Sequence, residues 1–171
     1  MQEPEVTVVR SRRRTRTVSA YREGGRLIVL VPARLSAAEE AHWVARMTER
    51  LAARDRRERP GEGELAERAE RLSRRYLDSR ARPASVRWVN NQQGRWGSCT
   101  PVDRTIRLSR RLLGMPSWVI DYVLLHELAH LLEVGHDPAF WALLDGFPRL
   151  ERARGYLEGV AATSGLDLSD G

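Results

Sequence analysis

Three histidines and a glutamate lie close together in the second half of the chain. His126 and His130 are four residues apart in an apolar stretch that predicts a helix, so both imidazoles lie on one helix face and can bind one metal ion. Glu127 follows His126 directly and projects to one side of that face. A carboxylate there can take a proton from a water molecule that the metal polarises. The spacing therefore predicts a zinc hydrolase site with Glu127 as general base.

The third metal ligand has two candidates, Glu133 and His136. A catalytic zinc ion has three protein ligands and one open position. Glu133 continues the helix face of His130, and three ligands in a row on a straight helix cannot surround a metal tetrahedrally. Gly135 can end the helix and turn the chain back towards the site. This favours His136, with Glu133 as the alternative.

A single histidine in an apolar helix usually only packs in the core. Here three of the four histidines fall between residues 126 and 136, and burying such a polar cluster without a metal would be costly. The spacing from His126 to His136 equals that of the metzincin motif. However, Glu133 stands where that motif has glycine, and no Met-turn follows, so we do not assign the chain to the metzincins.

The hydrophobic pattern predicts runs of strands and runs of helices, which is typical of an α+β fold. The predicted strands are residues 6–9, 15–21, 27–31, 85–90 and 104–109, with a turn at 23–26. The predicted helices are residues 36–54, opened by a capping box of Ser36 and Glu39, then 64–79, 118–133, 139–144, opened by Asp137 and Pro138, and 149–162. Residues 54–63 and 91–103 are predicted as loops.

Several short motifs accompany the histidines. They are Trp96-Gly-Ser-Cys-Thr100, Ile106-x-Leu108, Pro116-x-x-Val119-Ile-Asp-Tyr-Val123, His126-Glu-Leu-Ala-His130, Gly135-His136 and Phe140-Trp141. Over about residues 86–157 the chain resembles the YgjP-like metallopeptidase family, which is related to SprT-like and other minimal zincins. The resemblance implies a compact zincin domain, one zinc ion per chain at His126, His130 and His136, and Glu127 as the catalytic residue.

We therefore expect a single metallopeptidase domain over residues 1–171. It would comprise a β-rich part (1–35), a helical part (36–80), a zincin core (85–163) and a frayed tail (164–171). The expected fold is α+β, with a small antiparallel or mixed sheet, an active-site helix, and an N-terminal β-hairpin plus helices.

The expected substrate is a peptide or protein. The resemblance suggests that an extended substrate pairs with a strand beside the active helix, either 85–90 or 104–109. Asn90, Asn91, Gln92 and Arg95 can donate hydrogen bonds to a peptide or an oxyanion, or they are only polar surface residues. Tyr122, about one helical turn before His126, either assists the site or packs in its wall.

An alternative function is nucleic-acid binding. All 29 basic residues are arginine and the net charge is +6, which can attract polyanions. The segment 10–16 is the densest cluster, and it could also recruit a protease to DNA. No aromatic residues interleave with its arginines to stack bases, and a purely structural zinc would not need Glu127. Peptide hydrolysis is therefore the favoured function.

The remaining features predict a soluble, cytoplasmic protein. Cys99 is the only cysteine, so no intrachain disulfide exists. The N-terminal residues lack the apolar stretch of a signal peptide, and the longest apolar runs are too short to span a bilayer. We expect no membrane partner. The pattern does not specify the oligomeric state.

Overall fold

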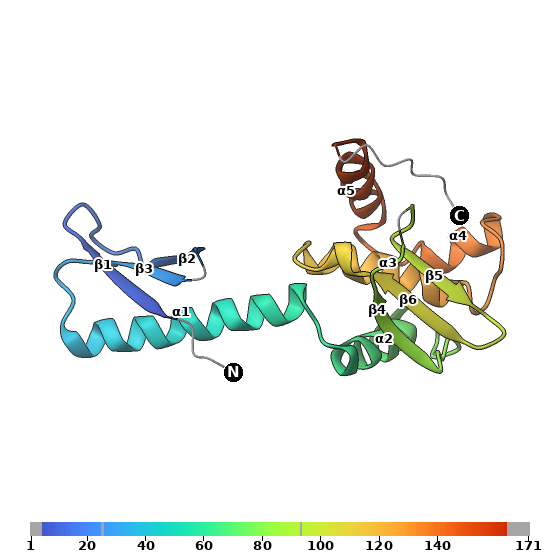
Figure 1. Cartoon of the computed structure of the whole chain (residues 1–171), viewed down its shortest axis with the longest axis horizontal. Helices are drawn as coiled ribbons and strands as arrows, with labels where there is room; N and C mark the ends of the chain where they lie inside the picture. Colours follow the sequence, from blue (N-terminus) through green and yellow to red (C-terminus); the bar gives the residue numbers. More distant parts are fainter. Residues whose placement is uncertain (1–4, 25, 93, 164–171) are drawn as a thin grey trace. The chain divides into compact units, whose positions relative to one another are not determined.

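The computed structural model describes residues 5–24, 26–92 and 94–163. Contacts divide the chain into two compact units, residues 1–56 and 57–171. Each unit contains a three-stranded mixed sheet and helices (Figure 1), so the predicted α+β class is confirmed. The predicted turn at 23–26 includes Gly25, which lies outside the described residues, as does the predicted tail at 164–171.

The first unit is a sheet packed on one long helix. Its strands β1 (Val6–Ser11), β2 (Ser19–Glu23) and β3 (Arg26–Pro32) lie in the order β1-β3-β2. The central strand β3 pairs parallel with β1 and antiparallel with β2. Alternate residues of β3, Leu27, Val29 and Val31, are buried with Met47 of α1 (Ala37–Glu58), because successive side chains of a strand point to opposite faces. The predicted strand at 15–21 begins only at Ser19.

The first helix begins where predicted but ends later. Glu39 accepts hydrogen bonds from the Ser36 amide at 2.8 Å and hydroxyl, and the Ser36 hydroxyl accepts from the Glu39 amide at 3.3 Å, so the capping box is present. The predicted loop at 54–63 is wrong over much of its length, since α1 continues to Glu58 and α2 (Glu62–Tyr76) begins at Glu62. Arginine and glutamate are good helix formers, so the charged run extends α1.

The arginine cluster at 10–16 is partly used to stabilise the first unit. Arg10 pairs with Glu40 at 2.6 Å and donates to the carbonyl oxygens of Ala33 and Leu35. Arg14 donates to the hydroxyl of Ser19 at 3.0 Å. These contacts are structural, so they do not leave the whole cluster available for a polyanion.

The second unit contains a smaller mixed sheet. Its strands β4 (Ser85–Val89), β5 (Gly97–Thr100) and β6 (Thr105–Ser109) lie in the order β4-β6-β5, with β6 parallel to β4 and antiparallel to β5. The predicted loop at 91–103 is therefore wrong at β5. The suggestion that residues 104–109 pair with substrate is also wrong, because β6 has strands on both sides.

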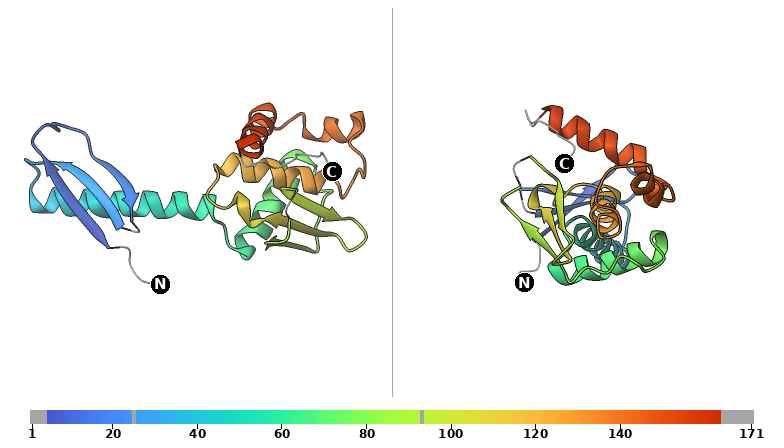
Figure 2. Two further views of the ribbon diagram at one scale, coloured as in Figure 1. Left: turned by 45° about the horizontal axis from the view of Figure 1, so that its top comes forward. Right: turned by 90° about the vertical axis from the view of Figure 1, so that its right-hand side faces the viewer.

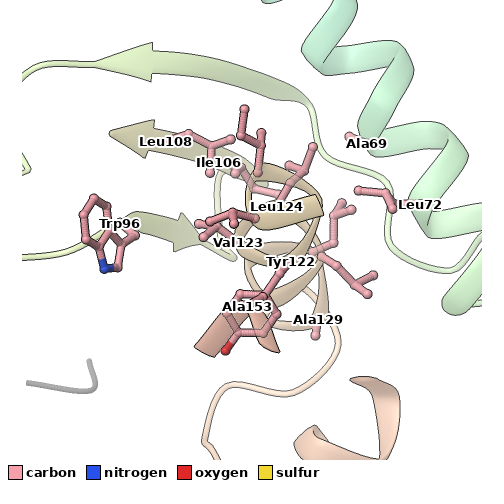
Figure 3. Close-up of a cluster of buried hydrophobic side chains, with 14 of the residues drawn as sticks. Ala69, Leu72, Trp96, Ile106, Leu108, Tyr122, Val123, Leu124, Ala129 and Ala153 are labelled. Carbon is pink, nitrogen blue, oxygen red and sulfur yellow. The ribbon is translucent and has the colours of Figure 1, made fainter. Parts of the chain in front are cut away.

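Helix α3 (Ser117–Ala129) forms the centre of the second unit. Its apolar residues are spread around all sides, as expected for a buried helix, and Leu124, Leu125 and Leu128 are fully buried. Figure 3 shows its side chains between Ile106 and Leu108 of β6, Ala69 and Leu72 of α2, and Ala153 of α5. The strands and the other helices thereby fix the helix that carries His126 and Glu127.

The remaining elements of this unit surround α3. They are a 3₁₀ turn, η1 (Arg110–Leu112), and the helices α4 (Pro138–Leu144) and α5 (Leu150–Thr163). The views in Figure 2 place α3, α4 and α5 together in the same unit. Within the described residues, none of the helices has the length and apolar composition needed to cross a membrane.

The start of α3 is held by a buried ion pair. Arg68 of α2 is 7% exposed, and its Nε lies 2.5 Å from Asp121 Oδ1. The same guanidinium donates to the carbonyl oxygens of Arg57 and Ser117. Arg68 has its charge paired and each of its three side-chain nitrogens hydrogen-bonded, so it fixes the position of α3 relative to α2.

Candidate metal centre

The three clustered histidines converge at the end of α3. The Nε2 atoms are separated by 3.2 Å between His126 and His130, 3.1 Å between His130 and His136, and 3.0 Å between His136 and His126. Ligands of a tetrahedral zinc ion at about 2.0–2.1 Å from the metal lie about 3.3 Å from one another. The triangle therefore matches three corners of such a tetrahedron and leaves the fourth corner open.

The protonation of two of these imidazoles, His126 and His130, also fits a cation. His130 Nδ1 lies 3.0 Å from the carbonyl oxygen of Glu133, so Nδ1 donates and the Nε2 lone pair faces the other two rings. Burial, with the charges of His130 and His136, lowers the pKa of His126 to about 3. Burial also lowers the pKa of His130. Neutral rings with converging lone pairs are the donor set of a divalent metal.

The segment after α3 brings His136 to the other two histidines. Helix α3 ends at Ala129, earlier than the predicted end at 133, and 3₁₀-type bonds follow, such as Leu131 N to the Leu128 carbonyl at 3.1 Å. Gly135 has no positive φ, so the turn does not depend on the conformational freedom of glycine. The expected break of the helix is therefore present, but it begins before Gly135.

Aromatic residues of α4 support the imidazoles. Asp137 accepts from the Phe140 amide at 2.9 Å and caps α4 as predicted. Phe140 is fully buried and stacks on the His130 ring at 4.5 Å between centroids. Trp141 Nε1 donates to the His136 carbonyl oxygen at 3.0 Å. The first contact orients the His130 ring, and the second holds the backbone of His136.

The carboxylate of Glu133, the alternative ligand, does not join the three histidines. Among the described residues, the metal-capable group contains His126, His130 and His136 but not the Glu133 carboxylate. Glu133 contributes its backbone carbonyl oxygen, which accepts from His130. The geometry therefore supports His136 as the third ligand, which stays a prediction.

Glu127 is buried beside the histidine triangle. It is 6% exposed, and burial raises its pKa to about 8, although the positive charge of Arg95 opposes this. Gly97 of β5 packs directly against it, since a Cβ at that position would lie 2.6 Å from Glu127 Oε1. A residue larger than glycine at 97 would thus collide with the carboxylate.

A cavity of about 310 Å³ opens onto these residues. Its walls come from β5 and the preceding loop, from α3, from residues 134 and 136, and from α5. Cys99 of β5 lines it, and burial followed by the charge of Glu127 raises the pKa of its thiol to about 11. A thiol with such a pKa stays protonated near neutral pH, so it is not an activated nucleophile.

The cavity contains some of the predicted substrate residues. Arg95 and Tyr122 line it, and Tyr122 is 8% exposed with its ring edge-on to His126. Asn90 and Asn91 are exposed and do not line it. Gln92 donates to the Ser98 hydroxyl at 2.6 Å, so it supports the loop before β5.

Sequence reasoning missed two walls of the cavity. The first is β5, although the motif beginning at Trp96 marked that region. The second is α5, which contributes Arg154, Leu157 and Glu158. No feature of the α5 sequence distinguishes these residues from those of an ordinary surface helix.

A helix that carries two histidines and a glutamate beside a small mixed sheet is typical of zinc metalloproteases. The family model described as YgjP-like, metallopeptidase domain, matches residues 49–159. The chain belongs to this family, as its motifs suggested, and the family implies a divalent metal and a protein or peptide substrate.

A solved structure has a similar fold. The crystal structure of the metallopeptidase zymogen of Pyrococcus abyssi abylysin aligns with a TM-score of 0.50 and 24% sequence identity. The alignment covers 61% of this chain and 99% of that chain. No curated protein matches the chain.

Proposed function

We propose that the protein is a zinc-dependent peptidase in which His126, His130 and His136 hold one zinc ion and Glu127 is the general base. The observation that carries this proposal is the triangle of three Nε2 atoms at 3.0–3.2 Å, which opens onto the same cavity as Glu127. The family membership supports the same activity.

Each part of the site has a chemical role. Zinc would supply a Lewis acid that polarises the scissile carbonyl and makes a water molecule more acidic. Glu127 takes the proton from the attacking water and later delivers it to the leaving amine. Burial raises the pKa of this carboxyl group, which helps it to hold the proton once it is transferred. The positive charge of Arg95 lowers the pKa of Glu127, which favours the carboxylate form that accepts the proton.

The sheet provides a place for an extended peptide. β5 is an edge strand in the order β4-β6-β5, and it lines the cavity. An edge strand presents backbone donors and acceptors that can pair with another extended chain. We assign the substrate-pairing role to β5 in place of the two strands suggested by the sequence.

The proposal predicts about one zinc ion per purified chain. His126→Ala and His130→Ala should each lose it, because two remaining ligands bind zinc poorly. Metal analysis of both variants checks this result. His42→Ala is the matched control, since His42 is the one histidine outside the cluster, and it should keep zinc. Full zinc content in both cluster variants would refute the assignment.

Hydrolysis should depend on the same metal. Removing zinc with a chelator should abolish cleavage of a casein or peptide-library substrate, and adding zinc back should restore it. Cleavage that survives complete removal of the metal would contradict the proposal.

A third prediction concerns the contact between β5 and Glu127. Gly97→Ala should lower turnover by about 100-fold, because the added Cβ displaces the carboxylate and a shift of about 1 Å can cost that much. The matched control is Gly94→Ala, which also lies in the cavity wall but whose Cβ would meet nothing within 4 Å. Equal turnover in the two variants would show that the Gly97 contact does not position Glu127.

A further inference from the structure

Helix α5 places a cation in the cavity that the proposed chemistry does not use. Among the described residues that line the cavity, the basic side chains are Arg95 and Arg154. Arg95 lies on the wall next to Glu127. Arg154 lies on a different wall, which α5 forms. Leu157 and Glu158 of α5 also line the cavity.

Arg154 is linked to the histidine cluster through Trp141. Its guanidinium carbon lies 4.9 Å from the centre of the Trp141 ring, within the range of a cation–π contact. Trp141 in turn donates to the His136 carbonyl oxygen.

The donors of Arg154 are only partly used. Its side chain is 36% exposed, and its ion pair is a 3.4 Å contact with Glu151, whose side chain is 80% exposed. A guanidinium carries five N–H donors in a planar fork that matches a carboxylate. One exposed contact leaves donors for a ligand in the cavity. Glu158 lies one turn further along α5 and also lines the cavity, so its negative charge disfavours an anion near that residue.

We propose that Arg154 is a substrate-binding residue that recognises a carboxylate of the peptide beside the cleavage site. The carboxylate belongs either to an acidic side chain or to the C-terminus of the substrate, since both present the same two oxygens. This inference rests on the proposed function, because it places the carboxylate next to a peptide bond held at the zinc site.

Zinc-directed thiol ligands test the inference without requiring turnover. Mercaptoacetyl-Glu-amide and mercaptoacetyl-Gln-amide have the same shape and the same thiol, which is a good zinc ligand, and they differ in one charge. Mercaptoacetyl-Leu and mercaptoacetyl-Leu-amide make the same comparison at the C-terminus. Affinities are measured calorimetrically on the zinc-loaded full chain, on Arg154→Gln, and on Arg152→Gln. Arg152 is the matched control because it lies on α5 like Arg154 but does not line the cavity. Its guanidinium carbon lies 5.0 Å from the centre of the Trp118 ring.

The charged member of at least one pair should bind wild type about tenfold more tightly, as expected for a hydrogen bond to a charged group. Arg154→Gln should remove this preference and leave the affinity of the neutral ligand unchanged, whereas Arg152→Gln should keep it. The pair that shows the preference identifies the source of the carboxylate. If both charged ligands bind like their neutral partners, or if the preference survives in Arg154→Gln, the inference is overturned. If the neutral ligands fail to bind the zinc-loaded wild type, the proposed function fails, and this inference fails with it.

Discussion

Replacing Glu127 with glutamine is expected to reduce peptide turnover by at least about 10²–10⁴-fold while zinc remains bound. Proton transfer by a positioned base contributes a factor of this size. Glutamine has nearly the same shape as glutamate but cannot take a proton from the attacking water. The three imidazoles proposed to bind the metal are untouched by the change, so zinc content should match wild type.

The buried position of Glu127 makes this variant structurally mild. Glu127 is 6% exposed and burial raises its pKa to about 8, so the metal-free protein already disfavours a charge there. A neutral amide of the same volume is no more costly to bury than a carboxylate. The melting temperature of zinc-free Glu127→Gln should therefore not fall below that of zinc-free wild type.

Three measurements on one preparation check the result: zinc content, thermal melting and peptide turnover. Glu158→Gln is the matched control, because it removes the same charge from another wall of the same cavity, and it should stay within severalfold of wild-type turnover. Undiminished turnover in zinc-loaded Glu127→Gln would exclude Glu127 as the base. Loss of zinc would show instead that Glu127 is a ligand or holds the ligands in place.

The histidine cluster could be predicted because its geometry is local. His126 and His130 are one helical turn apart, so the period of the helix alone brings both rings to one face. The sequence predicted that His136 lies close to the other two histidines, but it attributed the turn to Gly135, and the helix ends earlier. The chain leaves the helix at Ala129 through 3₁₀-type bonds, and its direction is fixed by the packing of Phe140 and Trp141 on the imidazoles.

Strand β5 could not be predicted because its stability is not local. It has four residues, begins at a glycine and shows no clear alternation of buried and exposed side chains. It forms because its backbone pairs with β6, for example Cys99 with Ile106, and because Gly97 packs against Glu127. Tertiary context of this kind commonly overrides strand propensity.

The cavity wall on α5 depends on long-range packing as well. Ala153 and Leu157 are buried in the main core and place α5 near α3, and Arg154 reaches the site only as a result. Segments separated by loops are positioned by core packing, which single-sequence patterns do not specify. The sequence therefore indicated which histidines converge better than it indicated which elements form the walls of the cavity.

The second large effect is expected at the third metal ligand. His136→Ala should weaken zinc binding by at least about 100-fold, because even residues that only support a ligand cost about 10–100-fold when changed. Glu133→Ala should change the affinity only severalfold. The Glu133 contact with His130 is made by the backbone carbonyl oxygen, which alanine retains.

Competition with a chromophoric zinc chelator at fixed pH ranks the two variants. The melting temperature of each zinc-free protein shows whether the fold is intact, which separates loss of a ligand from loss of structure. His136 lies in the turn before α4, and its backbone carbonyl oxygen still accepts from Trp141 in the alanine variant, so the turn should persist. Zinc held as tightly by His136→Ala as by wild type, with weak binding in Glu133→Ala, would move the third ligand to Glu133. That result would require the segment after Ala129 to rearrange, because the three Nε2 atoms at 3.0–3.2 Å already form the closed side of the site.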